Sequence, residues 1–415
     1  MQKRHFGYWN QVPASGVEEL SPCLSRERNH QSNQVTPRSM NILQVIPRLE
    51  TGGAERTTLE IAQALVMGGD NAFVVSEGGR MEDELLKTGA RLIKMPVDSK
   101  SPFGLLSNAG SMAQLIRDEG IDLIHARSRA PAWSALRAAR KTGIPFVTTY
   151  HGAYNAKSGL KRFYNSVMAR GDRVIANSQF IGAHVRSEHG VPESRITVIP
   201  RGVDVERFAP SVQTMARGRD LATRLSLPDD RVIAVLPARL TRWKGQVLAI
   251  DAMAQLKADN RPLPLMLLVG DDQGRSTYRM ELESLIAAHA LERDVWLVGH
   301  QNDMPAIYAL ADMALNPSTD PEAFGRTAAE ASAAGLPVIA ADHGGAREVV
   351  LPGKTGWRST PGDAKALANA LDEAMIMDKE ARITMGQAGA EHVAGNFTVS
   401  RLQEATLRVY RELLK

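Results

Sequence analysis

The stretch NILQVIPRLETGGAERTTLEIAQALV, residues 41–66, contains the pattern that decides the fold. It opens with the apolar run Ile42–Ile46, which is typical of a strand buried on both faces of a parallel sheet. A loop with two glycines follows, and in Glu55–Val66 the apolar residues recur at the spacing of an amphipathic helix. A strand, a tight turn and a helix in this order predict the start of a βαβ series.

The same alternation extends outward from this segment over most of the chain. In the first half, strands are expected at Ile42–Ile46, Ala72–Val75, Arg91–Met95, Leu123–His125, Pro145–Thr149, Val174–Ala176 and Ile196–Ile199. In the second half, strands are expected at Val232–Leu236, Leu265–Gly270, Val295–Gly299, Met313–Asn316 and Val338–Ala341. Between them lie stretches of helical length, several of which end at a glycine, as helix C-termini favour. The pattern predicts two α/β domains with parallel sheets, facing each other across a cleft.

Breaks in this alternation predict the domain boundaries. Residues 1–39 are polar, contain several prolines and lack periodicity, so we expect a disordered N-terminal extension. A misassigned start codon, with Met40 as the true first residue, would explain the same composition. Pro200–Arg224 is polar and has no expected strand, and we interpret it as the interdomain linker. We expect a first domain at 40–210, a second at 211–398 and a closing amphipathic helix within 399–415.

The composition is that of an ordinary globular protein. The 415 residues are 43% hydrophobic and 23% charged, and the net charge of +4 is too small to predict a nucleic-acid-binding face, although it permits contact with an anionic membrane or substrate. Cys23 is the only cysteine, which excludes an intramolecular disulfide and favours a reducing compartment. No apolar run reaches the roughly 18 residues of a transmembrane helix, and the N-terminus lacks the apolar core of a secretory signal. We expect a cytoplasmic protein.

Two loops that follow expected strands carry groups suited to phosphate, because ligands of open α/β sheets bind at the carboxyl ends of the strands. In the loop after the first strand, Gly52 and Gly53 permit close backbone approach, and the following helix offers free N–H groups to an anion. A tight strand–helix turn would explain the same glycines. In the loop after the first strand of the second half, Arg239 and Lys244 could converge on a diphosphate, and a solvated basic loop is the alternative. Neither the spaced-glycine dinucleotide fingerprint nor the P-loop pattern is present.

The strongest signal is the segment Asp320–Ala331. Pro321 suits a helix entrance, Glu322 precedes the expected helix and Glu330 lies within it among alanines. A carboxylate in such a setting is either buried with a partner or faces a ligand, where it could accept both hydroxyls of a ribose. Gly325 would let backbone amides approach a ligand oxygen. An exposed helix carboxylate is the alternative for Glu330.

Residues after other strands add weaker signals. His151 begins a glycine-containing loop that would face the cleft, although a single histidine is more often structural than catalytic. Gly270 and Gly299 also end strands and could line a pocket for a base. No spacing of His, Asp or Glu predicts a metal site, and no Ser–His–Asp arrangement is visible.

Three of these motifs together resemble glycosyltransferase family 4, the group 1 glycosyltransferases. They are TGGAER at 51–56, ARLTRWKGQ at 238–246 and PEAFGRTAAEASAAGLPVIAADHGGAREVV at 321–350. The resemblance extends from Met40 to the C-terminus. It implies the GT-B architecture, in which two Rossmann-like domains are followed by a helix that returns to the first. It also implies a retaining transfer from a nucleotide-diphosphate sugar without a metal cofactor.

On the phosphate side, the resemblance implies that Arg239 and Lys244 neutralise the donor diphosphate, and that Gly52 and Gly53 approach the phosphates or the acceptor. Charge that develops on the departing diphosphate would then be stabilised by two cations and a helix N-terminus. Retaining hydrolases use two carboxylates that flank the bond, but no second carboxylate of that kind is evident. The resemblance implies instead that the acceptor attacks on the face from which the diphosphate departs, with the diphosphate as base.

On the sugar side, the resemblance implies that Glu330 binds the ribose hydroxyls and that Glu322 lies beside the transferred sugar. The backbone N–H groups of Phe324 and Gly325 would contact that sugar, and His151 would contact it from the first domain. These roles make the Glu322–Glu330 segment a holding device for the donor. The leaving-group chemistry falls to the basic loop.

The expected acceptor is a glycan or a lipid-linked glycan, in the synthesis of lipopolysaccharide core, capsule or another surface polysaccharide. A basic cluster in the first domain could contact an anionic inner membrane, or could be a solvated face. It comprises Lys157, Lys161, Arg162, Arg170 and Arg173, around Phe163 and Tyr164. Two other classes remain open, a non-catalytic nucleotide-sugar-binding protein and a nicotinamide-dependent oxidoreductase. The missing glycine fingerprint argues against the oxidoreductase.

Overall fold

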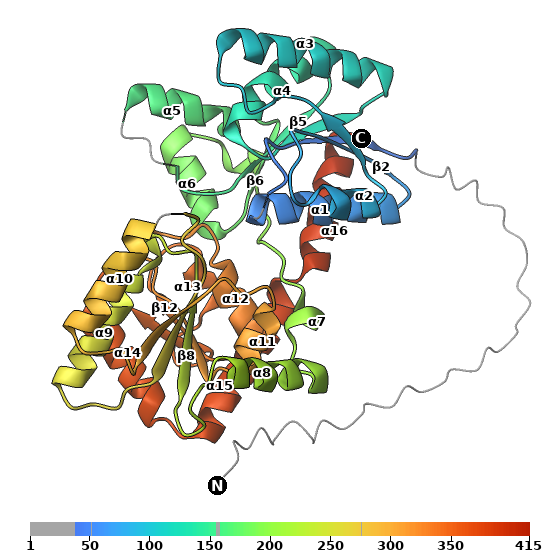
Figure 1. The fold of residues 1–415 in the computed structure, drawn as a ribbon. Helices are drawn as coiled ribbons and strands as arrows, with labels where there is room; N and C mark the ends of the chain where they lie inside the picture. Colours follow the sequence, from blue (N-terminus) through green and yellow to red (C-terminus); the bar gives the residue numbers. More distant parts are fainter. Residues whose placement is uncertain (1–37, 51, 155–157, 275) are drawn as a thin grey trace, which may run out of the picture.

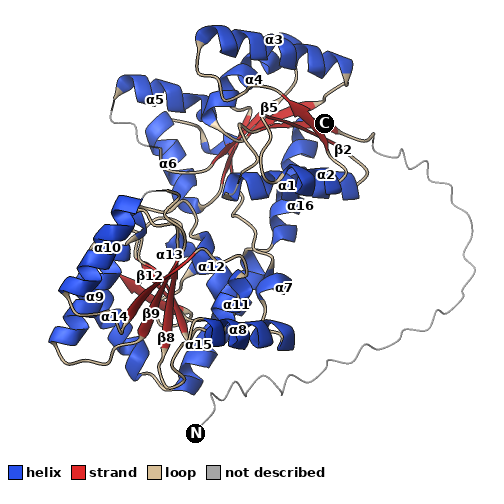
Figure 2. Ribbon diagram, viewed as in Figure 1, coloured by secondary structure: helices blue, strands red, loops and turns tan. Residues whose placement is uncertain are grey.

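The computed structural model describes residues 38–50, 52–154, 158–274 and 276–415. They form two α/β domains, each built on one parallel sheet with helices packed on its faces (Figure 1, Figure 2). The predicted N-terminal extension, residues 1–39, lies outside the described residues except for Arg38 and Ser39.

The first domain has a seven-stranded sheet in the order β3-β2-β1-β4-β5-β6-β7. Its strands are β1 (Asn41–Val45), β2 (Asn71–Ser76), β3 (Arg91–Lys94), β4 (Leu123–Ala126), β5 (Phe146–Tyr150), β6 (Arg173–Ala176) and β7 (Ile196–Val198). Its helices are α1 (Gly53–Met67), α2 (Glu82–Lys87), α3 (Pro102–Asp118), α4 (Arg129–Thr142), α5 (Gly159–Asn165) and α6 (Gln179–His189). Short 3₁₀ turns lie at Ser166–Ala169 and Glu193–Arg195.

The second domain has a six-stranded sheet in the order β10-β9-β8-β11-β12-β13. Its strands are β8 (Ile233–Pro237), β9 (Leu265–Val269), β10 (Val295–Gly299), β11 (Met313–Asn316), β12 (Val338–Ala341) and β13 (Gly356–Ser359). Its helices are α9 (Gln246–Ala258), α10 (Ser276–Ala288), α11 (Met304–Ala309), α12 (Arg326–Ala333), α13 (Ala346–Val349), α14 (Ala364–Ile376) and α15 (Lys379–Asn396), with a 3₁₀ turn at Arg242–Lys244. In each sheet the first three strands are added toward one edge and the later strands toward the other. The order reverses between β1 and β4 in the first sheet and between β8 and β11 in the second. This is the doubly wound order of a Rossmann-like domain.

The apolar residues of the strands pack alternately on the two faces of each sheet. In β1, Ile42 belongs to the cluster that includes α1, whereas Leu43 and Val45 belong to the cluster that includes α3 and α4. Both faces are covered by helices, so every position of such a strand must be apolar or hydrogen-bonded. This explains the continuous apolar runs of the sequence. The strand β13 was not predicted, because its sequence GWRS has no such run.

The chain crosses between the domains at two adjacent points. Val203 on the way out and Thr398 on the way back pair in an isolated parallel bridge, with the Val203 N–H 2.7 Å from the Phe397 carbonyl oxygen. The last helix, α16 (Val399–Leu413), then packs on α1 of the first domain (Figure 1). Two Rossmann-like domains with a returning last helix were predicted, and the structure confirms this architecture.

The predicted linker Pro200–Arg224 has no strand but contains two helices, α7 (Val205–Phe208) and α8 (Val212–Arg224). Phe208 and Leu221 are buried in the core of the second domain, so much of this segment belongs to that domain. The prediction failed here because most of the α8 surface is polar and solvated, with a narrow buried stripe against α11. Among the described residues, no helix is both long and apolar enough to span a membrane.

Candidate active site

The loops at the carboxyl ends of the two sheets meet (Figure 1). Helix α6 follows β6 of the first domain, and its N–H groups at Gln179 and Phe180 donate hydrogen bonds of 3.0 and 3.1 Å to the two carboxylate oxygens of Glu348, on α13 of the second domain. Ala323, from the loop after β11, packs against the core of the first domain. Open α/β sheets bind ligands at these ends of their strands, so this junction is the candidate site.

A buried ion pair joins two loops of the second domain. Gly245 has a φ of +80°, and a Cβ at this position would lie 2.2 Å from the carbonyl oxygen of Pro317. This close approach presses the loop after β8 against the loop after β11. Lys244 Nζ consequently lies 2.7 Å from Glu322 Oε1, and Ser318 Oγ donates to the same oxygen at 2.5 Å.

The Glu322 carboxylate is held in its ionised form. The residue is only 8% exposed, and burial by itself raises its pKa. The charge and hydrogen bond of Lys244, with the hydroxyl of Ser318, outweigh burial, so the pKa of Glu322 lies below its ordinary value. At neutral pH this carboxylate therefore carries a full charge and has no proton to donate.

Arg239 occupies the same loop as Lys244 in a different environment. Its side chain is exposed, and its Nη1 makes one long hydrogen bond of 3.4 Å to Gln273 Oε1. The Lys244 side chain is mostly buried against its carboxylate partner. One cation of the loop is therefore fixed in place, whereas the other can reorient toward an anion.

The turn at Glu322–Gly325 precedes α12, which begins at Arg326, so Pro321 does not mark the helix entrance as predicted. Gly325 adopts a φ of +88°, which favours glycine. Phe324 is 2% exposed and packs edge-on against Phe397, so its side chain is part of the core. Among the described residues, no acceptor is hydrogen-bonded to the backbone N–H groups of Phe324 and Gly325.

Glu330 has a cationic partner on its own helix. Arg326 Nε donates a 2.9 Å hydrogen bond to Glu330 Oε1, and the Glu330 side chain is 13% exposed. Burial, followed by the nearby charge of Glu330, raises the pKa of Tyr308 well above its ordinary value. Of the alternatives that the sequence left open for Glu330, the exposed carboxylate is excluded, and a partly buried, paired carboxylate is observed.

In the first domain, His151 lies directly after β5 and contacts an arginine. Its Nδ1 lies 3.3 Å from Arg201 Nη2, and its Nε2 is buried and has no partner among the described residues. Burial, Arg201 and Arg127 lower the pKa of His151 well below its ordinary value, so the ring is neutral. Since the guanidinium can only donate, Nδ1 accepts, and the proton lies on the unpaired Nε2.

Arg201 was not among the predicted site residues, because it was assigned to the linker. A Cβ at Gly53 would lie 1.4 Å from Arg201 Nη1, so the glycine at the start of α1 makes room for this side chain. Desolvation and the charge of Arg326 lower the pKa of Arg201 to about 10. The signal in the sequence was its position just after the strand β7, which is shared by the residues that were predicted.

The other three predicted glycines have different structural roles. Gly52 has an extended backbone (φ 179°), which any residue can adopt. Gly270 donates its N–H to Gly299 O at 2.9 Å, and a Cβ there would lie 2.0 Å from the Ala238 carbonyl oxygen, so this glycine packs strand ends together. Its N–H is therefore not free for a base. Gly299 has a φ of +71° and open space beside it.

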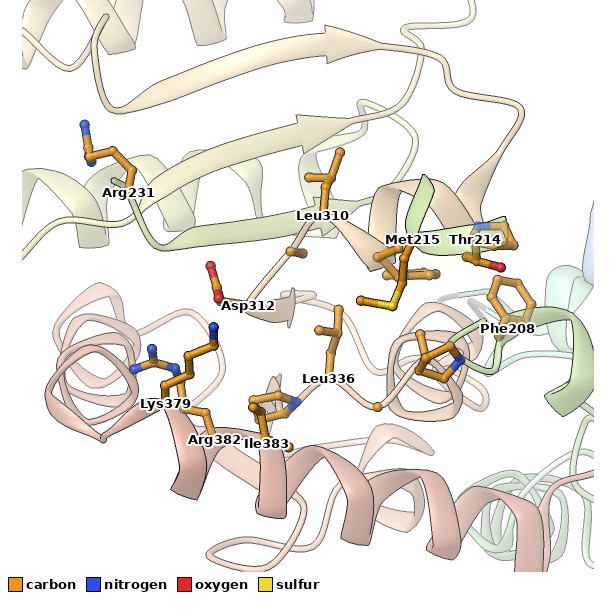
Figure 3. A pocket seen from close by; sticks show the side chains of 18 of the residues that line it. Phe208, Thr214, Met215, Arg231, Leu310, Asp312, Leu336, Lys379, Arg382 and Ile383 are labelled. Carbon is orange, nitrogen blue, oxygen red and sulfur yellow. The ribbon is translucent and has the colours of Figure 1, made fainter. Parts of the chain in front are cut away.

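A separate cavity of about 290 Å³ lies at the opposite end of the second sheet (Figure 3). Asp312 and Pro337, which line it, precede β11 and β12, so it opens at the amino ends of these strands. Its arginines are engaged: Arg231 pairs with Asp294, and Arg382 donates to backbone carbonyl groups. The cavity is thus distinct from the junction of the two domains, and none of the predicted site residues lines it.

Comparison with known proteins agrees with this geometry. The model for Glycosyltransferase Family 4 matches residues 51–207, and that for Glycosyl transferases group 1 matches residues 220–392. The structure of a glycosyltransferase from Rickettsia africae is similar, with a TM-score of 0.84 and 33% identity over 91% of this chain and 99% of the other. Anabaena HepE, solved in complex with UDP, has a TM-score of 0.79 and 27% identity over 90% of this chain and all of its own. D-inositol 3-phosphate glycosyltransferase of Xylanimonas cellulosilytica is 29% identical over 88% of this chain and 93% of its own. The chain therefore belongs to the family 4, group 1 glycosyltransferases, with the GT-B arrangement of two Rossmann-like domains.

Proposed function

We propose that the protein transfers a sugar from a nucleotide-diphosphate sugar to a glycan or lipid-linked acceptor, with retention at the anomeric carbon and without a metal. The observation that carries this proposal is the loop after β8, where Lys244 is fixed against Glu322 and Arg239 remains exposed. Two cations of one loop at the carboxyl edge of a sheet suit a diphosphate.

The leaving diphosphate gains negative charge as its bond to the anomeric carbon breaks. Arg239 and Lys244 would stabilise that charge, because fixed cations in a partly buried site need little reorganisation during the reaction. The backbone N–H groups of Phe324 and Gly325 would hold the sugar, and Glu330 would accept hydrogen bonds from the ribose hydroxyls. Arg239, Lys244 and the two N–H groups would thus supply the charge stabilisation that a divalent cation provides in other transferases.

The state of Glu322 favours same-face attack over a covalent intermediate. A double displacement requires a carboxylate nucleophile and a separate acid, with the two carboxyl groups about 5–5.5 Å apart in retaining hydrolases. Glu322 is engaged by Lys244 and Ser318 and has no proton to give. In the proposed reaction the acceptor oxygen bonds to the anomeric carbon as the diphosphate oxygen leaves, and the acceptor proton passes to the diphosphate.

The donor can be identified with a panel of UDP-, GDP- and ADP-sugars, scored by thermal shift and by release of the nucleoside diphosphate, in the presence of EDTA. Because HepE was solved with UDP and with UDP-glucose, UDP-glucose is the first donor to test. Retention is checked by NMR of the anomeric proton of the product. Inversion, turnover that requires added metal, or an Arg239→Ala variant with full activity would each contradict the proposed mechanism.

The acceptor is proposed to be a surface glycan or its lipid-linked precursor, of the kind used in lipopolysaccharide or another surface polysaccharide, reached from the cytoplasmic face of the membrane. An apolar surface with adjacent cations supports membrane contact. Leu160 on α5 is 79% exposed, and Phe103 at the start of α3 is 86% exposed. Helix α3 packs on α4, and Phe163 of α5 contacts Trp133 of α4. Lys161 is exposed beside Leu160.

The predicted basic cluster is only partly assembled on this surface. Arg173 is the first residue of β6, so it lies at the amino ends of the strands, whereas α5 follows the carboxyl end of β5. Its guanidinium is 3.7 Å from the Glu412 carboxylate on α16. Lys157 lies outside the described residues. Arg162 forms an ion pair with Glu188, whereas Arg170 covers the ring of Phe163. The proposed contact therefore depends on the exposed apolar side chains and Lys161 more than on a dense positive patch.

Flotation with vesicles of phosphatidylcholine and phosphatidylglycerol tests this contact. The variant Leu160→Ser with Lys161→Glu should remain in the soluble fraction at ionic strengths where the wild type floats. Met280→Ser, at an exposed apolar position of the second domain, is the matched control. Equal flotation of all three proteins would remove the proposed membrane contact and leave the proposed transfer reaction untouched.

A further inference from the structure

We infer that Glu348 is a positioning residue, which joins the two domains and sets the separation between His151 and Glu322. This inference rests on the proposed transfer reaction, in which groups of both domains contact one sugar. Glu348 lies in neither of the loops to which the proposed chemistry is assigned. Its function would be to hold those loops in register.

The contact of Glu348 with the first domain adds to the cap of helix α6. The Oε2 atom accepts from Gln179 N at 3.0 Å and the Oε1 atom from Phe180 N at 3.1 Å. Ser178 Oγ accepts from Ile181 N at 3.0 Å. The first N–H groups of a helix have no partner within the helix, and a carboxylate is the preferred group to satisfy them. Here α6 receives part of its cap from its own chain segment and part from the opposite domain.

The capped end of α6 is directly connected to His151. Strands β5 and β6 are paired so that Tyr150 lies opposite Ala176. The next residues along each strand are His151 and Asn177, and Asn177 Nδ2 lies 3.5 Å from the His151 carbonyl oxygen. Any displacement of the start of α6 therefore moves the loop that carries His151.

On the other side, the backbone that carries Glu348 is attached to the Glu322 turn. Gly345 N donates to Glu322 O at 2.8 Å. A Cβ at Gly344 would lie 2.5 Å from the same oxygen, and one at Gly345 would lie 2.5 Å from Ala323 O, so the two segments are in direct backbone contact. A further hydrogen bond of 2.9 Å, from His392 Nε2 to the Glu348 carbonyl oxygen, fixes α13 to α15.

A single side chain thus completes a path from Glu322 to His151. Each carboxylate oxygen accepts from a different N–H group, so the two bonds together restrict the relative orientation of the domains. Separation of the domains would break both bonds together. The bridge therefore selects the orientation in which His151 and the donor-holding turn act on one sugar, while the binding of the nucleotide depends on the second domain alone.

The test compares Glu348→Ala and Glu348→Gln with Asp363→Ala, a matched control. Asp363 Oδ1 caps α14 by accepting from Ala366 N at 3.0 Å, within the second domain. We measure kcat and KM with the donor found in the panel, the Kd of UDP (or of the nucleoside diphosphate from that donor) by calorimetry, and thermal stability. Spin labels at Lys141→Cys and Lys365→Cys, both exposed in the native protein, in a Cys23→Ser background report the domain separation.

Glu348→Ala should lower kcat by about tenfold or more, because small misplacements of reacting groups are costly. The Kd of the nucleotide should change by no more than about twofold, as expected for distant sites. The label distance should be a single narrow distribution in the wild type and in Asp363→Ala, and broader in Glu348→Ala. Glu348→Gln should be intermediate, because its amide nitrogen cannot accept a hydrogen bond.

An unchanged kcat in Glu348→Ala, or an unchanged distribution of label distances, would overturn the inference. A nucleotide Kd that weakens in parallel with kcat would also overturn it, because Glu348 would then support only the fold of the second domain. Failure of the proposed function has a different signature. In that case the wild type itself transfers no sugar from any donor of the panel, while the label distances still report whether Glu348 joins the domains.

Discussion

At the scale of single residues, Lys244 and Glu322 form a buried ion pair within the candidate site. An isolated charge with so little exposure would strongly destabilise the folded protein. In this pair, the charge of each residue offsets the cost of burying the other. Ser318 supplies a further hydrogen bond to the carboxylate. The pair lowers the net positive charge of the loop, so Arg239 is its remaining uncompensated cation in the described structure.

Glu322→Gln should destabilise the protein and change its dependence on pH. The folded pKa of Glu322 is below the ordinary value, so its contribution to stability is fully present above about pH 4.3, the unfolded pKa, and is lost as the pH falls through the folded pKa. At pH 7 the variant should lose roughly 1–3 kcal/mol of unfolding free energy, because Lys244 is left without its counter-charge. Urea unfolding at several pH values between 3 and 7 measures both effects.

The control for that experiment is Glu281→Gln, which removes an exposed partner of Arg242. Exposed ion pairs contribute little, so its unfolding curve should match the wild type at neutral pH. If Glu322→Gln lost no stability at pH 7, or lost as much stability on acidification as the wild type, Glu322 would not be the depressed carboxylate described above.

Gly53 and Arg201 give a second prediction at the residue scale. A Cβ at position 53 would lie 1.4 Å from Arg201 Nη1, so Gly53→Ala must displace the guanidinium and with it the contact to His151. We expect Gly53→Ala to lower kcat/KM by about tenfold or more, since a misplacement of this size is costly. Adding Arg201→Ala to Gly53→Ala should restore the thermal stability that Gly53→Ala loses.

Gly110→Ala on α3 is the matched control, because no atom lies within 4 Å of the point that a Cβ at this position would occupy. A glycine in a helix is replaced by alanine at a gain of about 0.5–1 kcal/mol where space permits. If Gly53→Ala behaved like Gly110→Ala, Arg201 would not occupy the space beside Gly53.

At the scale of elements, α16 fastens the C-terminus of the second domain to the first. The Tyr410 hydroxyl lies 2.6 Å from His125 Nδ1, and His125 Nε2 lies 2.7 Å from Thr149 Oγ1. These three side chains are buried and lie on α16, β4 and β5. Burial raises the pKa of Tyr410 to about 12, so the phenol is neutral and can donate or accept.

Tyr410→Phe should lower the unfolding free energy by about 1–3 kcal/mol, the cost of leaving a buried polar atom unsatisfied. Hydrogen exchange within α16 should accelerate, because its hydrogen bond to β4 is lost. Tyr278→Phe is the comparison: it removes a longer bond of 3.3 Å to Gln246 inside the second domain. Equal acceleration of exchange in α16 in both variants would contradict a docking role for Tyr410.

At the scale of the whole molecule, the first six strands of the first domain have the same order as the six strands of the second. The two domains contribute different residues to the candidate site. The basic loop, the Glu322 turn and Glu330 all lie in the second domain, whereas the first contributes His151 and Arg201. The domains touch through the Glu348 bridge, Ala323 and the paired crossings at Val203 and Thr398. Donor binding and transfer are therefore expected to depend on different parts of the molecule.

If UDP is the nucleotide of the donor, a concentration 100 times its Kd should raise the stability of the domain that binds it by about 2.7 kcal/mol. Protection from hydrogen exchange should concentrate at residues 238–246 and 322–330, with little change in the strands β1 to β7. Mass spectrometry of peptides from the exchanged protein measures this. Protection confined to the first domain would contradict the assignment of the donor site.

Much of the architecture was predictable, because buried parallel strands have a local signature. Each of the twelve predicted strands agrees with an observed strand, β1 to β12, within one residue at either end. The two failures have local causes. The strand β13 has too few apolar residues, and the polar surface of α8 hid a helix in the expected linker. The sequence placed the candidate site residues in loops that follow strands. Arg201 was assigned to the linker, and Glu348 lies inside the motif at 321–350 but was given no role, because its hydrogen-bond partners belong to the other domain.

The sequence by itself determined the alternation of strands and helices and the residue types at the strand ends, because these depend on the periodicity of apolar residues along a short stretch. Only the tertiary structure decided which groups meet. Glu322 is paired with a lysine 78 residues away, and Glu348 caps a helix 168 residues away. Gly53 accommodates an arginine from beyond β7. The physical reason is that charge pairing and close backbone contact depend on distance in space, which the topology of two sheets sets and which no local pattern in the chain encodes.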